Sequence, residues 1–337
     1  MLEVSGLTVE YATTKDPLRA VDDVSFSVGR GEFVGIVGES GCGKSTLLFA
    51  VAQLLSPPAA ITAGSVTFRG QNLVTLTARQ LNAVRWQHLS VVMQSAMNAL
   101  NPVMSVGAQF ADALRAHGTT SRKAVAARSA EVLRLVGIDP VHAKSYPHQL
   151  SGGMRQRAMI AMALLFTPDL VIMDEPTSAL DVVAQRSLMT QIKELQREFG
   201  FAVIFVTHDM SLVSHYSDRL MVMYAGQVAE SGATRRVFET PLHPYTRGLL
   251  EAFPSIRGPK VPLEGIPGAP PDLSIIQNGC RFHPRCPVAM PECPTTAPAL
   301  LDHAGTDVRC LRYVPGTGKA ETTGNVAPGK AAKEAAQ

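Results

Sequence analysis

The sequence predicts an α/β fold built around a mainly parallel β-sheet. Three short runs of aliphatic and β-branched residues support this prediction, at Phe33–Val37, Leu170–Met173 and Ala202–Val206. Strands that are covered by helices on both faces have this near-continuous apolar character. Each run ends in polar or glycine-rich sequence, and ligands in open α/β sheets collect at the carboxyl ends of the strands. We therefore expect the segments that follow these three strands to converge on one ligand site.

The remaining elements follow from the periodicity of the apolar residues. Alternating patterns predict antiparallel strands at residues 2–9, 21–28 and 64–68. Apolar residues at i, i+3 and i+4 predict helices at 106–116, 124–136 and 185–199. A final strand is expected at 226–230 and a short helix at 244–252.

Composition describes a globular protein that does not cross a membrane. Of the 337 residues, 46% are apolar and 18% are charged, and the net charge of +3 says little about partners. No run of four or more Lys or Arg marks a patch for nucleic acid or lipid. The start of the chain, Met1–Ser5, lacks the basic and then apolar layout of a signal peptide. The most apolar helical candidate, Thr46–Leu55, is too short to span a bilayer. We expect a chain that is neither secreted nor inserted in the membrane.

The first apolar strand leads into a complete phosphate-binding loop, with the pattern G-x-x-x-x-G-K-[ST] between a strand and a helix. The loop consists of Gly38, Glu39, Ser40, Gly41, Cys42, Gly43, Lys44, Ser45 and Thr46. Its glycines let main-chain N–H groups close around a polyphosphate, and the helix N-terminus favours negative charge. Lys44 would reach the β- and γ-phosphates, and the Ser45 hydroxyl would bind Mg²⁺. The loop therefore predicts binding of a nucleoside triphosphate.

The second strand ends in two acids, Asp174 and Glu175. Asp174 is placed to hold Mg²⁺, and Glu175 to orient or deprotonate the attacking water. Acids at a strand end can also be merely solvated, but this alternative is not favoured beside a phosphate loop.

A second anion-binding element has the sequence Leu150-Ser151-Gly152-Gly153-Met154-Arg155-Gln156. Ser151 and the two glycines open a predicted helix at 154–165, so this helix N-terminus also attracts anions. One chain cannot easily place both termini around a single triphosphate. The pattern resembles the signature of ABC-type ATPases, whose cassettes dimerise head to tail. The resemblance implies that Ser151, Gly152, Gly153 and Gln156 bind the nucleotide held by the partner's phosphate loop.

Four further positions match functional residues of that family. Gln94 matches the Q-loop glutamine, which contacts Mg²⁺ and the attacking water and also meets the membrane domain of the transporter. Asp181, in Ser178-Ala179-Leu180-Asp181, matches the D-loop through which two cassettes communicate. His208 matches the switch histidine at the γ-phosphate, and Tyr11 matches the aromatic residue that stacks on adenine. The resemblance thus implies catalytic roles for Glu175, His208 and Gln94.

The composition of the sequence changes beyond Phe253. Nearly half of the 23 prolines fall between Pro254 and Pro298, and four cysteines lie in the same part of the chain: Cys280, Cys286, Cys293 and Cys310. Four thiolates suit Zn²⁺ or an iron–sulfur cluster, although their spacing fits neither common pattern, and reduced thiols without a metal are a third alternative. A proline-rich segment of this kind needs a staple or a docking surface to fold.

This part of the chain resembles the dipeptide/oligopeptide importer ATPases, as do Tyr146-Pro147-His148-Gln149, Val222–Gln227 and His243-Pro244-Tyr245-Thr246. In that family the cysteine set is understood to hold a [4Fe–4S] cluster, so the resemblance favours the cluster over zinc. Two positions depart from the family pattern. Cys42 replaces the usual serine of the loop, and Ser95-Ala96 replaces the Asp-Pro that often follows the Q-loop glutamine.

The resemblance implies an ABC-type P-loop NTPase cassette at residues 1–235. Within it we expect an N-terminal antiparallel β-subdomain and a helical signature subdomain at about 95–160. A small, irregular, cysteine-containing extension is expected at 236–314, and a disordered tail at 315–337.

The implied function is that of the ATP-hydrolysing subunit of a bacterial ABC importer for di- or oligopeptides or a similar small solute. Its cofactors would be ATP, Mg²⁺ and the [4Fe–4S] cluster. The expected partners are a second ABC ATPase subunit (a copy or a paralogue), two transmembrane permease subunits and an extracytoplasmic substrate-binding protein, with no nucleic acid. The expected location is peripheral, on the cytoplasmic face of the inner membrane.

Two alternatives are less favoured. One is a soluble ABC ATPase that acts in nucleic-acid or ribosome metabolism. Lys44 and Leu150 are too close in sequence for the long coiled coil of chromosome-type ATPases, and translation-type members carry two cassettes in one chain. The other is a nucleotide-binding regulator without turnover, against which the intact Glu175 and His208 argue.

Overall fold

The computed structural model describes residues 1–14, 16–94, 99–178, 180–252, 265–275 and 278–315. Contacts divide the chain into two compact units. Unit 1 contains Met1, Val28–Phe33 and Thr75–Thr207, and unit 2 contains Leu2–Ser27, Val34–Val74 and the described part of His208–Gln337. These units cut across the domain boundaries expected from the sequence, which remain predictions. Ser95, Ala96, Ala179 and all but the first residue of the predicted tail lie outside the described residues.

Three parallel strands form the sheet of unit 1, in the order β8-β7-β6. They are β6 (Leu89–Val92), β7 (Leu170–Asp174) and β8 (Ala202–Val206). Every residue of β7 and β8 is buried, which confirms the covered strands that the apolar runs predicted. Asp174 pairs with Val206, so the acidic end of β7 and the end of β8 lie at the same edge of the sheet.

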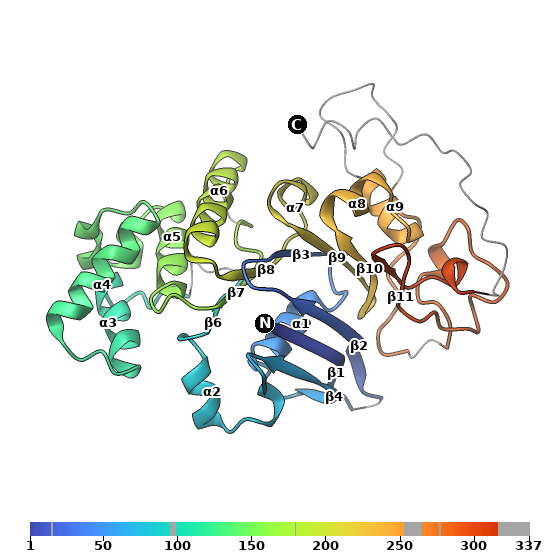
Figure 1. The fold of residues 1–337 in the computed structure, drawn as a ribbon, viewed down its shortest axis with the longest axis horizontal. Coiled ribbons are helices and arrows are strands. Elements are labelled where there is room, and N and C mark those ends of the chain that lie inside the picture. The colour runs from blue at the N-terminus through green and yellow to red at the C-terminus, as the bar shows by residue number, and fades with distance from the viewer. Residues whose placement is uncertain (15, 95–98, 179, 253–264, 276–277, 316–337) are drawn as a thin grey trace. The chain divides into compact units, whose positions relative to one another are not determined.

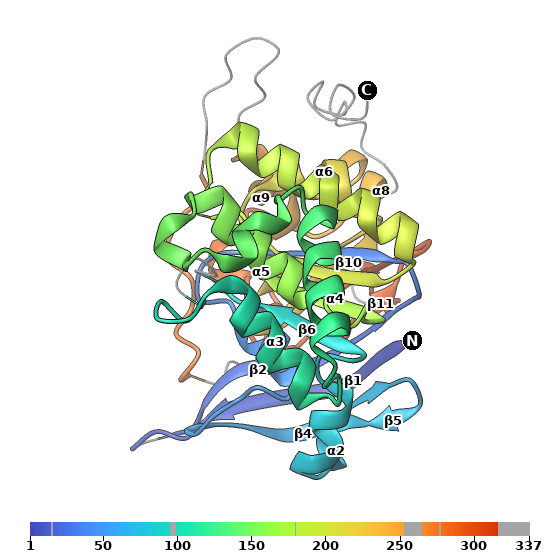
Figure 2. The same cartoon turned by 90° about the vertical axis from the view of Figure 1, so that its left-hand side faces the viewer.

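The helices of unit 1 are α2 (Ala78–Val84), α3 (Val106–Ala116), α4 (Arg122–Leu135), α5 (Gly152–Ala163) and α6 (Val182–Phe199). Helices α3, α4 and α5 pack side by side, as Figures 1 and 2 show. Arg128 on α4 donates hydrogen bonds to the carbonyl oxygens of Leu165 and Leu164 at 2.7 and 2.8 Å. Leu164 is the C-cap of α5 and Leu165 follows it. The bonds from Arg128 therefore satisfy carbonyl groups at the C-terminal end of the helix that begins at the signature.

Unit 2 contains the antiparallel sheet that the N-terminal sequence predicted. Its strands are β1 (Leu2–Tyr11), β2 (Leu18–Val28), β4 (Ala59–Phe68) and β5 (Gln71–Asn72), in the order β2-β1-β4-β5 (Figure 1). Strands β1 and β4 pair antiparallel along their whole lengths, with an irregularity between Ser5 and Val9.

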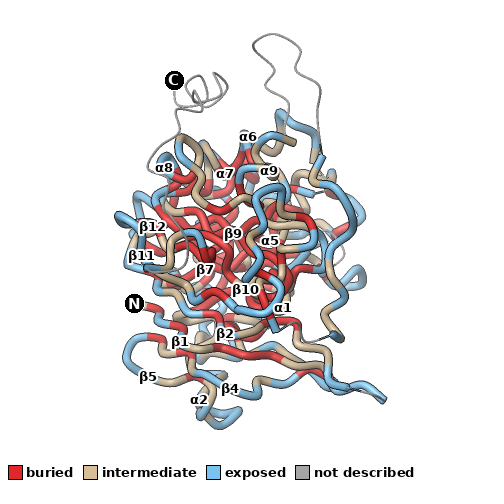
Figure 3. The backbone as a smooth tube through the Cα atoms, turned by 90° about the vertical axis from the view of Figure 1, so that its right-hand side faces the viewer, coloured by how far each residue is buried: buried red, intermediate tan, exposed pale blue. Residues whose placement is uncertain are grey.

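A second group of strands in unit 2 carries the phosphate loop. Residues Val34–Val37 of β3 (Phe33–Val37) pair in parallel with β9 (Arg219–Tyr224). Antiparallel pairing then continues through β10 (Gln227–Ala233) and β12 (Thr306–Val308) to β11 (Leu301–Asp302). Strands β9 and β10 are buried almost throughout (Figure 3). The cysteine-containing extension thus adds β12 and β11 to a sheet that begins in the cassette.

The α-helices in the described residues of unit 2 are α1 (Lys44–Val51), α7 (Met210–Tyr216), α8 (Thr234–Glu239) and α9 (Pro244–Glu251). Of the helices in the described ranges of both units, none has the length and apolar character needed to cross a membrane.

Candidate nucleotide site and cysteine-containing extension

The phosphate loop joins β3 to α1 and takes a path that only glycine permits at two points. Gly38 has φ 151°, and a Cβ there would lie 2.2 Å from the carbonyl oxygen of Met223. Gly43 has φ 99°, and its Cβ would lie 2.2 Å from the carbonyl oxygen of Ala20. Any larger residue would therefore clash with neighbouring main chain and disfavour the required backbone conformation. The loop geometry agrees with its predicted role as a phosphate cradle.

Lys44 points back across the loop and is mostly buried. Its Nζ donates to the carbonyl oxygens of Gly38 and Glu39, both at 2.8 Å. Phosphate oxygens are stronger acceptors for an ammonium group than neutral carbonyls. The lysine is thus held at the loop by contacts that a polyphosphate could replace.

The thiol of Cys42 is buried beside Lys44. It is 4% exposed, and its sulfur lies 3.7 Å from the Lys44 ammonium. Burial raises the pKa of Cys42, although the neighbouring Lys44 charge acts in the opposite direction. Burial thus disfavours the thiolate, which is the reactive form of cysteine.

Tyr11 lies next to the end of the phosphate loop. Its hydroxyl is 3.1 Å from the hydroxyl of Thr46, 35 positions away in the sequence. The structure thus brings this tyrosine to the loop, and stacking on adenine remains a prediction.

Gln94 and Glu175 meet in unit 1, at the end of β7. The Gln94 side-chain amide donates to a carboxylate oxygen of Glu175 at 2.9 Å. Glu175 has φ 47°, and its N–H donates to the carbonyl oxygen of Val206 at 3.0 Å. A positive φ in a residue other than glycine is strained, and such strain is found most often at functional sites. Asp174, immediately before it, is 1% exposed.

The signature sequence begins α5 with an open helix N-terminus. Ser151 is the N-cap, and its hydroxyl accepts a hydrogen bond from the N–H of Met154 at 3.3 Å. A Cβ at Gly153 would meet nothing within 4 Å. The buried side chain of Gln156 donates instead to the carbonyl oxygen of Pro176 at 2.5 Å. This bond ties α5 to the segment that follows Glu175.

Asp181 is the N-cap of α6 and accepts a hydrogen bond from the N–H of Ala184 at 2.9 Å. Val182 and Val183, which follow it, are 69% and 79% exposed. Two adjacent apolar side chains are thus exposed directly after the predicted D-loop.

The predicted site residues are divided between the two units. The phosphate loop, Tyr11 and the exposed His208 belong to unit 2. Gln94, Asp174, Glu175, the signature and Asp181 belong to unit 1. Within each unit, residues far apart in the sequence meet: Gln94 and Glu175 in unit 1, and Tyr11 and Thr46 in unit 2.

The four late cysteines are all free and lie in unit 2. The Cys280 N–H donates to the carbonyl oxygen of Cys293 at 2.8 Å, which closes one turn of the extension. The pKa of Cys280 is raised to about 11, mainly by burial and also by the nearby Cys310, Cys293 and Cys286, while a hydrogen bond from the main chain of Phe282 acts in the opposite direction. Burial also raises the pKa values of Cys286 and Cys310. Because a metal binds cysteine as the thiolate, the raised pKa values of Cys280, Cys286 and Cys310 oppose metal binding at neutral pH.

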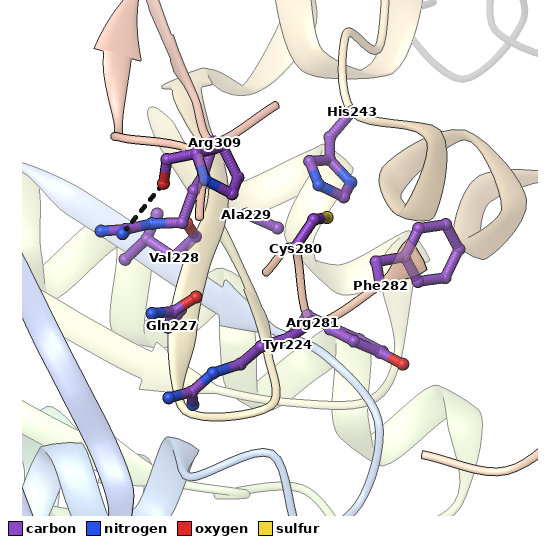
Figure 4. Close-up of a pocket in the computed structure, with 10 residues that line it drawn as sticks. Tyr224, Gln227, Val228, Ala229, His243, Cys280, Arg281, Phe282 and Arg309 are labelled. Atoms are coloured by element: carbon purple, nitrogen blue, oxygen red, sulfur yellow. Dashed lines mark hydrogen bonds between the residues drawn. The ribbon is translucent and has the colours of Figure 1, made fainter. Parts of the chain in front are cut away.

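No group of three His, Cys, Asp or Glu side chains suited to a metal ion was found within the described ranges, which include the four cysteines. Cys280 and His243 line one small pocket, together with Phe282 and Arg309 (Figure 4). The Nδ1 of His243 accepts a hydrogen bond from the N–H of Tyr245 at 3.0 Å. This ring nitrogen is therefore already engaged by the main chain.

Two residues that the sequence did not single out as site residues contact the phosphate loop. Tyr245 and Arg285 both bind Glu39. Tyr245 lies in His243-Pro244-Tyr245-Thr246, and Arg285 directly precedes Cys286. Both stretches resemble the importer family, but neither indicated that these side chains would bind Glu39.

Comparison with protein-family models agrees with the order of these motifs. The model of the ABC transporter family matches residues 21–178. The model of the C-terminal region of oligopeptide/dipeptide transporters matches residues 229–293. A third model, an AAA domain described as a putative AbiEii toxin of a type IV system, overlaps the first at residues 143–214.

Several curated relatives align with nearly the whole chain. The oligopeptide transport ATP-binding protein OppD of Salmonella typhimurium is 45% identical over 316 residues, 93% of this chain and 94% of that protein. AppD of Bacillus subtilis, also an oligopeptide transport ATP-binding protein, is 41% identical and covers 93% and 97%. The dipeptide transport ATP-binding protein DppD of Haemophilus influenzae is 40% identical and covers 92% and 94%.

Solved structures of ATP-binding cassettes share the fold. A dimeric, post-hydrolysis structure of the cassette MJ0796 with ADP and phosphate has a TM-score of 0.63 and 29% identity, covering 69% of this chain and 99% of that chain. CbiO1 of Clostridium perfringens, part of an ABC transporter complex, has a TM-score of 0.62 and 27% identity, covering 71% and 90%. The α/β cassette fold is thereby confirmed. The chain belongs to the ABC transporter ATP-binding proteins of the oligopeptide/dipeptide transporter family.

Proposed function

We propose that this chain binds and hydrolyses ATP to drive an ABC importer that takes up di- or oligopeptides, or a similar small solute. The observation that carries the proposal is the hydrogen bond between Gln94 and the strained Glu175 at the end of β7. It joins the Q-loop position to the position of the water-activating acid across 81 residues of sequence. The names of the relatives support a peptide as the transported solute.

In the proposed reaction, the phosphate loop binds the triphosphate through its N–H groups and Lys44. Ser45, Asp174 and Gln94 would hold Mg²⁺, which neutralises charge that develops on the phosphate oxygens. Tyr11 would stack on the adenine, and His208 would contact the γ-phosphate.

Glu175 would orient the attacking water and accept its proton. The water oxygen forms a bond to the γ-phosphorus while the bond from that phosphorus to the β–γ bridging oxygen breaks, which releases ADP and phosphate. The hydrogen bond from Gln94 holds one carboxylate oxygen of Glu175. Gln94 thereby keeps the acid in one orientation.

We propose further that two cassettes close head to tail around each nucleotide. The open N-terminus of α5 at Ser151 and Gly153 suits an anion carried by a partner. The exposed Val182 and Val183 would be covered in the same dimer. The partner is a second copy or a paralogue. Two permease subunits and an extracytoplasmic receptor would complete the importer, with this chain at the cytoplasmic face of the inner membrane.

For the four cysteines we propose a [4Fe–4S] cluster, with zinc as the second candidate. The match of residues 229–293, which contain three of these cysteines, to the C-terminal region of oligopeptide/dipeptide transporters supports the proposal, although the described side chains do not form a metal-binding group in this structure. Such a site would staple the proline-rich extension, which has little apolar surface of its own to bury.

Substitution Glu175→Gln tests the proposed reaction. It keeps the size and hydrogen bonding of the side chain but removes the carboxylate, so ATP binding should persist while turnover falls by about 10²–10⁴-fold. Glu198→Gln on the exposed face of α6 is the matched control and should hydrolyse ATP normally. With ATP and Mg²⁺, the Glu175→Gln protein should also dimerise, alone or with its paralogous cassette. Near-normal hydrolysis by Glu175→Gln would overturn the assignment.

A further inference from the structure

Glu39 of the phosphate loop is held by the C-terminal extension through its side chain and its main chain. The Arg285 guanidinium binds both carboxylate oxygens, with Nη1 at 2.7 Å and Nη2 at 2.9 Å. The Glu39 N–H donates to the hydroxyl of Tyr245 at 2.9 Å. A bidentate pair of this kind fixes direction as well as distance. The second residue of the loop is thus held by residues more than 200 positions away.

Arg285 is itself held rigidly. Its side chain is 5% exposed, and Nε donates to the carbonyl oxygen of Pro267 at 2.8 Å. Weaker bonds run to the carbonyl oxygen of Ile266 and to the Tyr224 hydroxyl, both at 3.3 Å. Since the guanidinium is planar and all of its nitrogens are bound, it cannot follow Glu39 if the loop moves. Arg285 therefore restrains the position of Glu39 in the loop.

The position of Arg285 depends on the fold of the extension. Arg285 ends the short 3₁₀ turn His283–Arg285, directly before Cys286. Phe282, just upstream, packs against the rings of Tyr224 and Tyr245 with centroid distances of 5.2 and 5.5 Å. The aromatic cluster and the cysteine-containing turns thus set where the guanidinium lies.

In the loop, Glu39 is hydrogen-bonded to groups that would bind phosphate. Its carbonyl oxygen accepts hydrogen bonds from Lys44 Nζ at 2.8 Å and from the N–H of Cys42 at 3.3 Å. A shift of Glu39 would move acceptors that place the lysine and the N–H groups of the cradle. Such small displacements matter because the cradle binds by preorganised geometry.

We propose that Arg285 is a positioning residue for the phosphate loop and couples the cysteine-containing extension to ATP binding. The inference rests on the proposed ATP-binding function. Arg285 acts through Glu39 and does not touch the nucleotide. Coupling of this kind is reciprocal, so bound ATP must stabilise the extension by as much as the extension strengthens ATP binding.

The test compares Arg285→Met with Arg309→Met in the full-length protein. Arg309 is a close match because it directly precedes Cys310 and is 9% exposed. It donates to the carbonyl oxygens of Val228 and Asp23, both at 3.2 Å, and of Pro298 at 3.4 Å, none of which belongs to the phosphate loop. Figure 4 shows Arg309 beside Val228. Titration with a fluorescent ATP analogue, at a temperature where both variants are folded by circular dichroism, should show about tenfold weaker binding for Arg285→Met. Arg309→Met should stay within about twofold of the unmodified protein.

Glu39→Gln supplies the same test from the loop side. It removes the charge that Arg285 binds, so it should also weaken binding by about tenfold. The double variant Glu39→Gln with Arg285→Met should bind no more weakly than Arg285→Met alone, because both changes break one connection. Additive losses would contradict a shared mechanism.

The effect of ATP on hydrogen exchange in the extension distinguishes coupling from a purely structural role of Arg285. ATP should slow amide exchange at residues 278–293 in the unmodified protein and in Arg309→Met, but not in Arg285→Met. If Arg285→Met does not fold, Arg285→Lys and Glu39→Gln replace it, since lysine keeps the charge but loses the bidentate geometry.

Equal ATP affinity in the unmodified protein and the Arg285 variant would overturn the inference and leave the proposed function standing. Equal losses in the Arg285 and Arg309 variants would overturn it too, since they would indicate general weakening of the extension. If the unmodified protein did not bind ATP, the proposed function itself would fail.

Discussion

His243 should make the stability of unit 2 depend on pH, and its surroundings give the size of the effect. The residue is 4% exposed and is the N-cap of α9, where its Nδ1 accepts the N–H of Tyr245. Burial lowers the pKa of His243 to about 4, although a hydrogen bond to the main chain of Arg309 opposes the shift. The folded protein therefore keeps this imidazole neutral at pH values where the unfolded chain protonates it.

The sign and magnitude follow from proton linkage. The unfolded chain binds more protons between pH 6.5 and about 4, so lowering the pH through this window favours unfolding. The contribution of His243 to the free energy of unfolding should fall by about 2 kcal/mol at pH 5 and about 3 kcal/mol at pH 4, relative to pH 8. Below the folded-state pKa both states are protonated, and the contribution no longer changes.

The assay is urea unfolding followed by circular dichroism at pH 8 and pH 5, on the unmodified protein and on His243→Asn. Asparagine can accept the same N–H at the N-cap, but it does not titrate. Buried Glu230, whose pKa is raised by burial, opposes the effect of His243, but both proteins contain it, so its contribution cancels in the comparison. We expect the variant to lose about 2 kcal/mol less on acidification. An equal loss in both proteins, or an imidazole NMR signal that titrates near pH 6.5, would refute the reasoning.

Three further predictions concern the nucleotide site and the extension. Lys44→Ala should weaken ATP binding by tenfold or more, on the order of one lost charge-assisted contact, and unchanged affinity in the same fluorescence titration would count against the cradle. Gln94→Ala should lower turnover with little change in ATP affinity, because its amide orients Glu175; steady-state kinetics that show a raised KM with unchanged kcat would contradict this. Protein purified without oxygen should contain iron and acid-labile sulfide, and Cys280→Ser should reduce both; zinc with neither would favour the second candidate.

The elements with strong local periodicity could be predicted closely from the sequence. Strands β3 and β8 and helix α3 have the bounds that their apolar patterns indicated, and α9 differs by one residue. Strands β5, β6, β9, β11 and β12 were not predicted. Strand β12 has three residues and pairs with the edge of β10, and β11 has two residues and pairs with β12. Such short strands have too few residues for a periodic pattern.

The sequence by itself determined the phosphate loop, the acidic strand end and the signature, because each is a short motif whose chemistry depends on neighbouring residues. Only the tertiary structure decided which distant residues meet: Gln94 with Glu175, Tyr11 with Thr46, and Glu39 with Arg285 and Tyr245. The physical reason is that local patterns fix which residues are helical, extended or buried. Contacts between segments far apart in sequence instead arise from the packing of whole strands and helices, and no motif encodes that packing.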